Sequence, residues 1–242
     1  MINFDLIQKM LVISFRKIMR STAEQVTNLL EFIILIPLLV FFVKTSIFDS
    51  SFFLKGTILL LFLNTITVAS SLGLSSILKR KEGFFREILS SPSSNMSIFL
   101  SLILGNMVLL LFRNLIILII VQIFGLGLSI FNATAILALS LVISPLIFFI
   151  ALILSSLIEN IRLLTILMTI FTLAQFMLSG ILISFKDFFW VAVNPFAYAA
   201  DLLIYVAGLE TNFPVVVDLV ITIVLTIATY IFASSLFSKV EV

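Results

Sequence analysis

The sequence of 242 residues contains no cysteine and no histidine, and only 11% of its residues are charged. Without cysteine there is no disulfide, thiolate nucleophile, iron–sulfur ligand or cysteine-based zinc site. Without histidine the commonest general base and metal ligand is missing, and with it every Ser–His and H-E-x-x-H arrangement. We therefore expect no catalytic residue and no metal site in this chain. The net charge of +2 does not indicate a nucleic-acid partner.

Apolar residues take the place of charge and make up 62% of the chain. A helix needs about 20 mostly apolar residues to cross the hydrocarbon core of a bilayer. Six such stretches are present, at about 29–47, 57–78, 98–124, 133–158, 163–183 and 215–237. Their apolar residues are continuous rather than alternating, which disfavours a β-barrel. The sequence thus predicts an all-α integral membrane protein with six transmembrane helices.

The first 25 residues have a different pattern. Apolar residues recur there at helical spacing, with charged residues between them: Phe4, Ile7, Leu11, Phe15 and Ile18. This pattern is typical of an amphipathic helix that lies in the membrane interface. A cleavable signal peptide is disfavoured, because charges are interspersed through the segment and no small-residue cleavage site follows. We expect an interfacial helix over 1–25 and a transmembrane domain over 26–242.

Basic residues predict the orientation of the spans, since cytoplasmic loops are enriched in Lys and Arg. Ten of them fall on one side of the predicted spans: Lys9, Arg16, Lys17, Arg20, Lys79, Arg80, Lys81, Arg86, Arg162 and Lys239. The other side has only three, which are Lys44, Lys55 and Lys186. Both termini are therefore expected in the cytoplasm, which agrees with an even number of spans.

Arg113 is the one basic residue near the middle of a predicted span. A central Arg costs about 2.5–3.5 kcal/mol on insertion scales, so we expect it to face the bundle or a wet cavity. Asp218 and Asp201 are the candidate partners, because they belong to the same half of the membrane. Two interpretations remain: Arg113 forms a structural ion pair, or it lines a substrate pathway and contacts an anionic headgroup.

Two segments outside the spans are informative. The predicted cytoplasmic connection 79–97 contains a short amphipathic stretch with two adjacent Phe, which Pro92 ends. Its apolar residues either dock a partner or rest on lipid in a basic turn. The predicted external segment 179–208 is too apolar for a solvated loop and is interrupted at Gly180 and at Asn194–Pro195. We expect short re-entrant or interfacial helices there.

Both segments resemble motifs of one family. The stretch 83–92, G-F-F-R-E-I-L-S-S-P, follows Glu82 and is similar to the E-G-T-L-E-x-L-L-x-x-P segment of permeases of type-2 ABC exporters. The stretch 194–201, N-P-F-A-Y-A-A-D, is similar to the N-P-L-T-Y-A-x-D motif that precedes the last span in that family. The resemblance, with six spans and an N-terminal interfacial helix, extends over essentially the whole chain.

The resemblance implies roles for the residues of both motifs. The first motif would form a coupling helix that sits in a groove of a separate ATPase subunit, with the residues Glu82, Gly83, Phe84, Phe85, Arg86, Glu87, Ile88, Leu89 and Pro92. The second would close the external end of the pathway, with Gly180, Trp190, Asn194, Pro195, Tyr198 and Asp201. It also implies a multi-pass protein of a prokaryotic inner or plasma membrane.

The chain has no G-x-x-x-x-G-K-[ST] sequence and so cannot cradle ATP phosphates itself. We therefore expect no cofactor in this chain, with ATP and Mg bound by a partner ATPase, and a homodimer or heterodimer with a second permease in lipid. The expected function is outward transport of a hydrophobic or amphipathic substrate such as a drug or lipid. The alternatives are export of lipid-linked polysaccharide and ATPase-independent secondary transport, which usually shows an inverted repeat.

Overall fold

The computed structural model describes residues 50–81, 95–123, 129–181 and 190–240, together with residues 8 and 12. Every regular element in these ranges is an α-helix. Five helices are long: α3 (Ser50–Lys81), α5 (Asn95–Ile123), α6 (Ile130–Leu157), α7 (Ile161–Leu178) and α10 (Val215–Val240). Two are short, namely α8 (Trp190–Val193) and α9 (Pro195–Val206). The predicted all-α fold is confirmed for the part of the chain that the structure describes.

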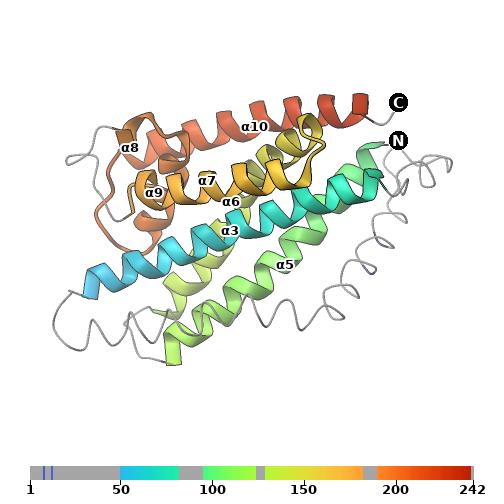
Figure 1. Ribbon diagram of the computed structural model, residues 1–242. Helices are drawn as coiled ribbons and strands as arrows, with labels where there is room; N and C mark the ends of the chain where they lie inside the picture. The colour runs from blue at the N-terminus through green and yellow to red at the C-terminus, as the bar shows by residue number, and fades with distance from the viewer. Residues whose placement is uncertain are drawn as a thin grey trace.

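The long helices alternate in direction along the bundle, so that their ends gather at two opposite ends (Figure 1). At one end, which we call the α9 end, α8 and α9 lie beside the start of α10. At the other, the Lys81 end, α3 ends, α5 begins and α10 ends. Three long helices, α5, α6 and α7, pack against α3, which is therefore a central element of the bundle.

Four helices are long and apolar enough to cross a membrane: Leu54–Leu78, Phe99–Ile123, Ile130–Leu157 and Val215–Leu236. They correspond to the predicted spans 57–78, 98–124, 133–158 and 215–237. The predicted span 163–183 is shorter than expected, because α7 ends at Leu178 and its apolar part is Ile161–Gln175. The predicted span 29–47 lies outside the described residues, as does the 1–25 helix apart from residues 8 and 12.

Side-chain caps explain where α6 and α7 begin. The hydroxyl oxygen of Ser129 accepts a hydrogen bond from the Asn132 N–H (3.0 Å) at the start of α6. The side-chain oxygen of Asn160 accepts from the Arg162 N–H (2.9 Å) at the start of α7. Such caps satisfy N–H groups that have no partner within the helix. The Asn160 cap lets α7 begin directly after the three-residue turn that joins it to α6.

Aromatic and small residues define the packing toward the Lys81 end. Phe99 of α5, Phe149 of α6 and Tyr230 of α10 form a cluster with ring centroids 5.5–6.1 Å apart. A Cβ on Gly73 of α3 would lie 3.1 Å from the carbonyl oxygen of Ala151, so α3 and α6 approach closely there. Small residues allow such approach between membrane helices.

Candidate functional site

The turn after α7 requires glycine. Gly180 has a φ of 77°, in the left-handed region that other residues rarely adopt. A Cβ on it would lie 2.8 Å from Cγ1 of Val191 and 3.2 Å from Nδ2 of Asn212. The end of α7 therefore packs directly on α8 and on the segment that precedes α10.

Asn194 joins the end of α7 to the start of α9. Its side-chain oxygen accepts from the Phe196 N–H (3.2 Å), which caps α9, and Pro195 follows in the first turn. Its Nδ2 donates to Oε1 of Gln175 (2.9 Å) and to the carbonyl oxygen of Leu178 (2.6 Å). The amide thus starts one helix and satisfies a carbonyl at the end of another.

Asp201 ties α9 to the segment before α10. Its side chain is fully buried, and its Oδ2 accepts from the backbone N–H groups of Asn212 (2.7 Å) and Phe213 (2.9 Å). Its Oδ1 accepts from Nδ2 of Asn212 (3.0 Å), which also donates to the carbonyl oxygen of Gly180 (3.1 Å). Three donors therefore converge on one carboxyl group, and Asn212 also links it to the turn that follows α7.

Opposing effects act on the pKa of Asp201. Burial raises it above its usual value, because the charged form is desolvated. The hydrogen bonds from Phe213 and Asn212, together with the charge of Lys55, lower it. Burial has the larger effect, so the pKa lies above that of an exposed aspartate.

Tyr198 completes this arrangement, which we call the α9 network (Gln175, Gly180, Asn194, Tyr198, Asp201 and Asn212). The Tyr198 hydroxyl donates to the carbonyl oxygen of Ala192 (2.9 Å) at α8, and its ring stacks on that of Phe213 with centroids 4.6 Å apart. Four of the six residues of the expected external closure therefore form hydrogen bonds at this end of the bundle: Gly180 and Asp201 through Asn212, Asn194 with the end of α7, and Tyr198 with α8. The other two, Trp190 and Pro195, begin α8 and α9.

Two members of the network were not singled out in the sequence, Gln175 and Asn212. Gln175 is 4% exposed and belongs to an apolar helix. A buried amide in such a helix is costly unless it is hydrogen-bonded, and that cost is the signal that could have identified it. Asn212 lies in a polar turn, where local sequence does not distinguish it from its neighbours.

Residues 82–92, the expected coupling helix, lie outside the described residues. The connection that contains them joins α3, which ends at Lys81, to α5, which begins at Asn95. It therefore joins the bundle at the opposite end from the α9 network.

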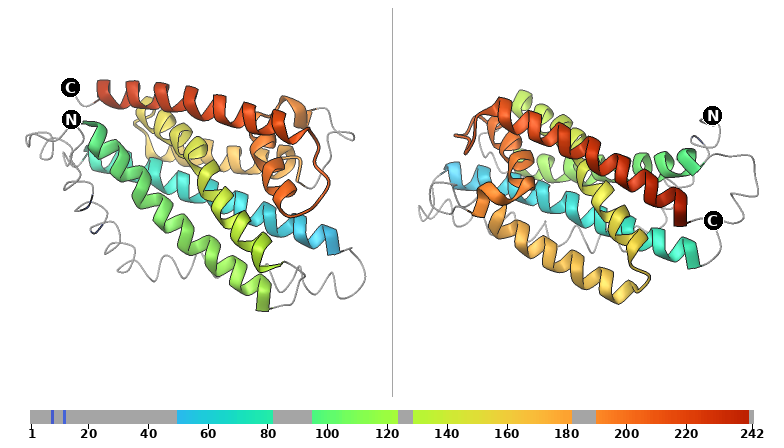
Figure 2. Two further views of the ribbon diagram at one scale, coloured as in Figure 1. Left: turned by 180° about the vertical axis from the view of Figure 1, so that it is seen from behind. Right: turned by 90° about the horizontal axis from the view of Figure 1, so that it is seen from above.

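Arg113 is buried in α5 at 5% exposure, as expected for a central Arg. Asp218 in the first turn of α10 is fully buried, and neither carboxyl oxygen has a hydrogen-bond partner among the described residues. These two side chains are therefore not joined by a hydrogen bond. Asp201, the other candidate partner, is engaged by Asn212 and Phe213. The helices α5 and α10, to which Arg113 and Asp218 belong, diverge toward the α9 end (Figures 1 and 2).

Asp218→Asn is expected to leave the thermal unfolding midpoint of the purified protein unchanged or to raise it. Burying a carboxylate without a partner costs more free energy than burying a neutral amide of the same shape. Thermal unfolding in mild detergent measures the effect, with Asp201→Asn as the matched variant that should lower the midpoint. An equal loss in both variants would contradict this interpretation and indicate a partner for Asp218 in the assembled protein.

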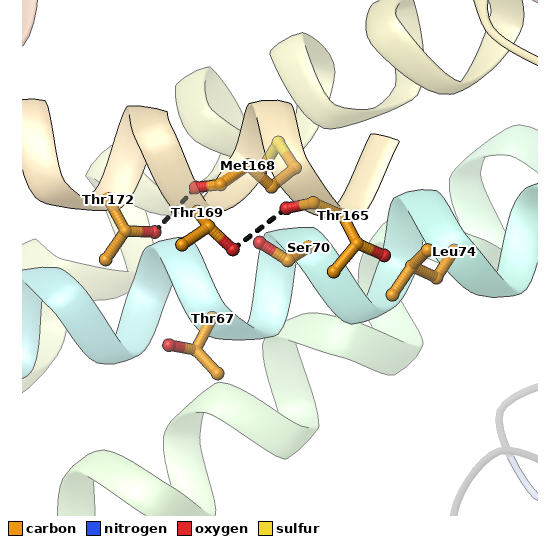
Figure 3. A pocket seen from close by; sticks show the side chains of 7 residues that line it. All are labelled: Thr67, Ser70, Leu74, Thr165, Met168, Thr169 and Thr172. Carbon is orange, nitrogen blue, oxygen red and sulfur yellow. Dashed lines mark hydrogen bonds between the residues drawn. The ribbon is translucent and has the colours of Figure 1, made fainter. Parts of the chain in front are cut away.

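A recess of about 210 Å³ lies between α3 and α7 (Figure 3). Hydroxyl groups dominate its lining, which consists of Thr67, Ser70, Leu74, Thr165, Met168, Thr169 and Thr172. The hydroxyls donate to carbonyls of their own helices, as Thr169 does to Thr165 (2.9 Å) and Thr172 to Met168 (2.8 Å). Their oxygens keep the capacity to accept, so the recess presents hydroxyl acceptors and methyl groups between two apolar helices.

Comparison with protein families gives one match. A family model described as ABC-2 type transporter matches residues 7–207, a region that includes both motif segments, 83–92 and 194–201. No curated protein matches the chain. The match covers most of the sequence and agrees with four helices that are able to span a membrane. The chain therefore belongs to the ABC-2 type transporter family and is a multi-pass integral membrane permease.

Proposed function

We propose that this chain is the membrane-spanning subunit of an ATP-driven exporter, paired with a second permease and bound to separate ATPase subunits. The family match over residues 7–207 is the observation that carries this proposal. The absence of a G-x-x-x-x-G-K-[ST] sequence supports a separate source of energy, since this chain has no phosphate-binding loop of that kind.

In this proposal the connection 82–94 receives the movement of the ATPase. Closure of the ATPases on ATP displaces the connection, and α3 and α5 carry the displacement into the bundle. The α9 network closes the far end of the pathway and opens when the bundle rearranges. ATP binding then shifts the population from an inward-facing to an outward-facing state, because the ATPases contact the two states differently.

The proposed substrate is a hydrophobic or amphipathic molecule such as a drug or a lipid. The recess between α3 and α7 supports this class, because its hydroxyl and methyl groups suit a molecule with both polar and apolar parts. Lipid-linked polysaccharide is the second candidate substrate. Assays of ATP-dependent transport, one with a fluorescent amphipathic dye and one with a labelled lipid-linked glycan, would distinguish the two substrate classes.

The first test is purification of the chain in mild detergent from its native host, followed by mass spectrometry of bound proteins. We expect an ATPase with a Walker motif to be recovered with the wild type and lost with the triple variant Phe84→Ala, Phe85→Ala, Ile88→Glu. Removing the apolar anchors of a docking surface removes most of its binding energy.

The matched control is the double variant Ser93→Ala, Ser94→Ala, which changes polar residues of the same connection and should retain the ATPase. Recovery of the same ATPase with the triple variant would place the contact elsewhere. If well-folded wild type brings no ATPase, the proposal fails and secondary transport becomes the favoured function.

A further inference from the structure

A buried polar chain joins three of the long helices. Nδ2 of Asn64 in α3 donates to Oδ1 of Asn114 in α5 (2.8 Å), and Nδ2 of Asn114 donates to the hydroxyl of Ser140 in α6 (3.0 Å). The Ser140 hydroxyl in turn donates to the carbonyl oxygen of Leu137 (2.8 Å). The three side chains are 0–3% exposed. We call them the amide clamp (Asn64, Asn114 and Ser140).

The clamp residues form hydrogen bonds between helices, whereas other polar side chains nearby bond within their own helix. Asn106 of α5 donates to the carbonyl of Leu102, and Thr65 of α3 donates to the carbonyl of Leu61, each within its own helix. Apolar packing between helices tolerates small sliding, whereas a hydrogen bond between buried amides holds one register, because a slide would leave polar groups without partners. The clamp therefore fixes α5 to α3 and α6.

The amide clamp lies along the bundle between the connection 82–94 and the α9 end. Asn64 and Asn114 lie roughly 25–30 Å along their helices from Lys81 and Asn95, at 1.5 Å per residue, and the connection 82–94 joins those two helix ends. At the α9 end, α3 and α6 pack against α9, while α5 has no comparable contact with it. A displacement of α5 can reach α9 through α3 and α6, and also through α10, which packs on both α5 and α9. The clamp belongs to the first of these routes.

We propose that the amide clamp makes α3, α5 and α6 move as one body and thereby transmits movement of the connection 82–94 to the α9 network. Asn64, Asn114 and Ser140 are positioning residues in this inference, which rests on the proposed function. Breaking the clamp leaves the ATPase site intact in the partner subunit but separates ATP hydrolysis from opening of the α9 end.

The test uses a reporter cysteine in the complex of the full chain with its ATPase. Ala197 is 1% exposed and lies in α9 among the residues of the α9 network, and the chain has no native cysteine, so Ala197→Cys is the single reactive site of this chain. Labelling by a maleimide is measured before and after trapping with ATP and vanadate. In the reporter background we expect labelling to accelerate about tenfold on trapping, as the open state becomes populated.

Adding Asn114→Ala is expected to reduce this acceleration to less than about twofold while ATP hydrolysis continues. Asn106→Ala is the matched control, because among the described residues its amide donates within α5, to Leu102, and it should retain the full acceleration. Ser140→Ala and Ser140→Thr form a second pair, in which Thr keeps the hydroxyl and should restore the response. If Asn114→Ala does not fold, the comparison of Ser140→Ala with Ser140→Thr tests the clamp inference in its place.

The possible results of this test distinguish failure of the proposed function from failure of the clamp inference. If the reporter alone does not respond to ATP and vanadate, the proposed function fails, and the clamp inference fails with it. If the reporter responds equally with and without Asn114→Ala and Ser140→Ala, only the clamp inference is overturned. A parallel fall of ATP hydrolysis and labelling, in proportion to the amount of folded complex, also overturns it, because it reflects a structural role alone.

Discussion

Asp201→Ala is expected to lower the free energy of unfolding by about 3–5 kcal/mol, because buried N–H donors left without an acceptor cost about 1–3 kcal/mol each. Three N–H donors, two from Asn212 and one from Phe213, lose their common acceptor in this variant. Each hydrogen bond to a charged group contributes about 1.5–3 kcal/mol, and the three are not independent. The segment before α10 would then detach from α9.

Thermal unfolding followed by fluorescence checks this expectation, since the chain has one Trp and that residue, Trp190, begins α8 beside the network. Asp201→Asn is the graded comparison: it keeps one acceptor oxygen and should show an intermediate loss. Asp218→Asn is the control at a buried acid whose carboxyl oxygens accept no hydrogen bond from the part of the chain that the structure describes. An unchanged midpoint for Asp201→Ala would mean that the three hydrogen bonds do not stabilise the α9 end.

Gly180→Ala is expected to cost about 2–4 kcal/mol, from two separate causes. Adopting a left-handed conformation costs a residue with a side chain about 1–2 kcal/mol, and Gly180 has a φ of 77°. Overpacking adds about 1–3 kcal/mol, since the new Cβ would lie 2.8 Å from Cγ1 of Val191. Relief of the clash would also displace Asn212, which links this turn to Asp201.

Gly208→Ala isolates the conformational cost. Gly208 follows α9 with a φ of 78°, and a Cβ there meets no atom within 4 Å. The Gly208 N–H donates to the carbonyl of Tyr205 and the Leu209 N–H to that of Ile204, the pattern of a Schellman helix end. We expect a loss of about 1–2 kcal/mol for this variant. Equal losses at the two glycines would show that contact with Val191 adds nothing.

The coarse architecture could be predicted because it depends on the length of apolar runs. Four predicted spans agree with observed helices to within a few residues at most ends, since each run must match the thickness of a bilayer whatever its neighbours are. The span 163–183 was placed less well. The apolar stretch of the sequence continues past Leu178, but the turn at Gly180 ends α7.

The candidate site was predicted as a set of residues but not as a set of contacts. The spacing of the N-P-x-x-Y-x-x-D segment indicated Asn194, Tyr198 and Asp201, because a short motif is visible within one segment. Their partners Gln175 and Asn212 come from other elements, and nothing local to either motif specifies them. The residues of 82–92 remain a prediction.

The sequence by itself determined that the chain lies in a membrane as a set of helices, that it has no phosphate-binding loop, and which short segments interrupt the spans. Those properties follow from composition and from patterns within one stretch of chain. Only the tertiary structure decided which polar groups meet: it formed no hydrogen bond between Arg113 and Asp218, and it joined Asn64 to Asn114 across 50 positions of sequence. Partner choice depends on how helices diverge and pack in three dimensions, and the order of residues along one helix does not contain that information.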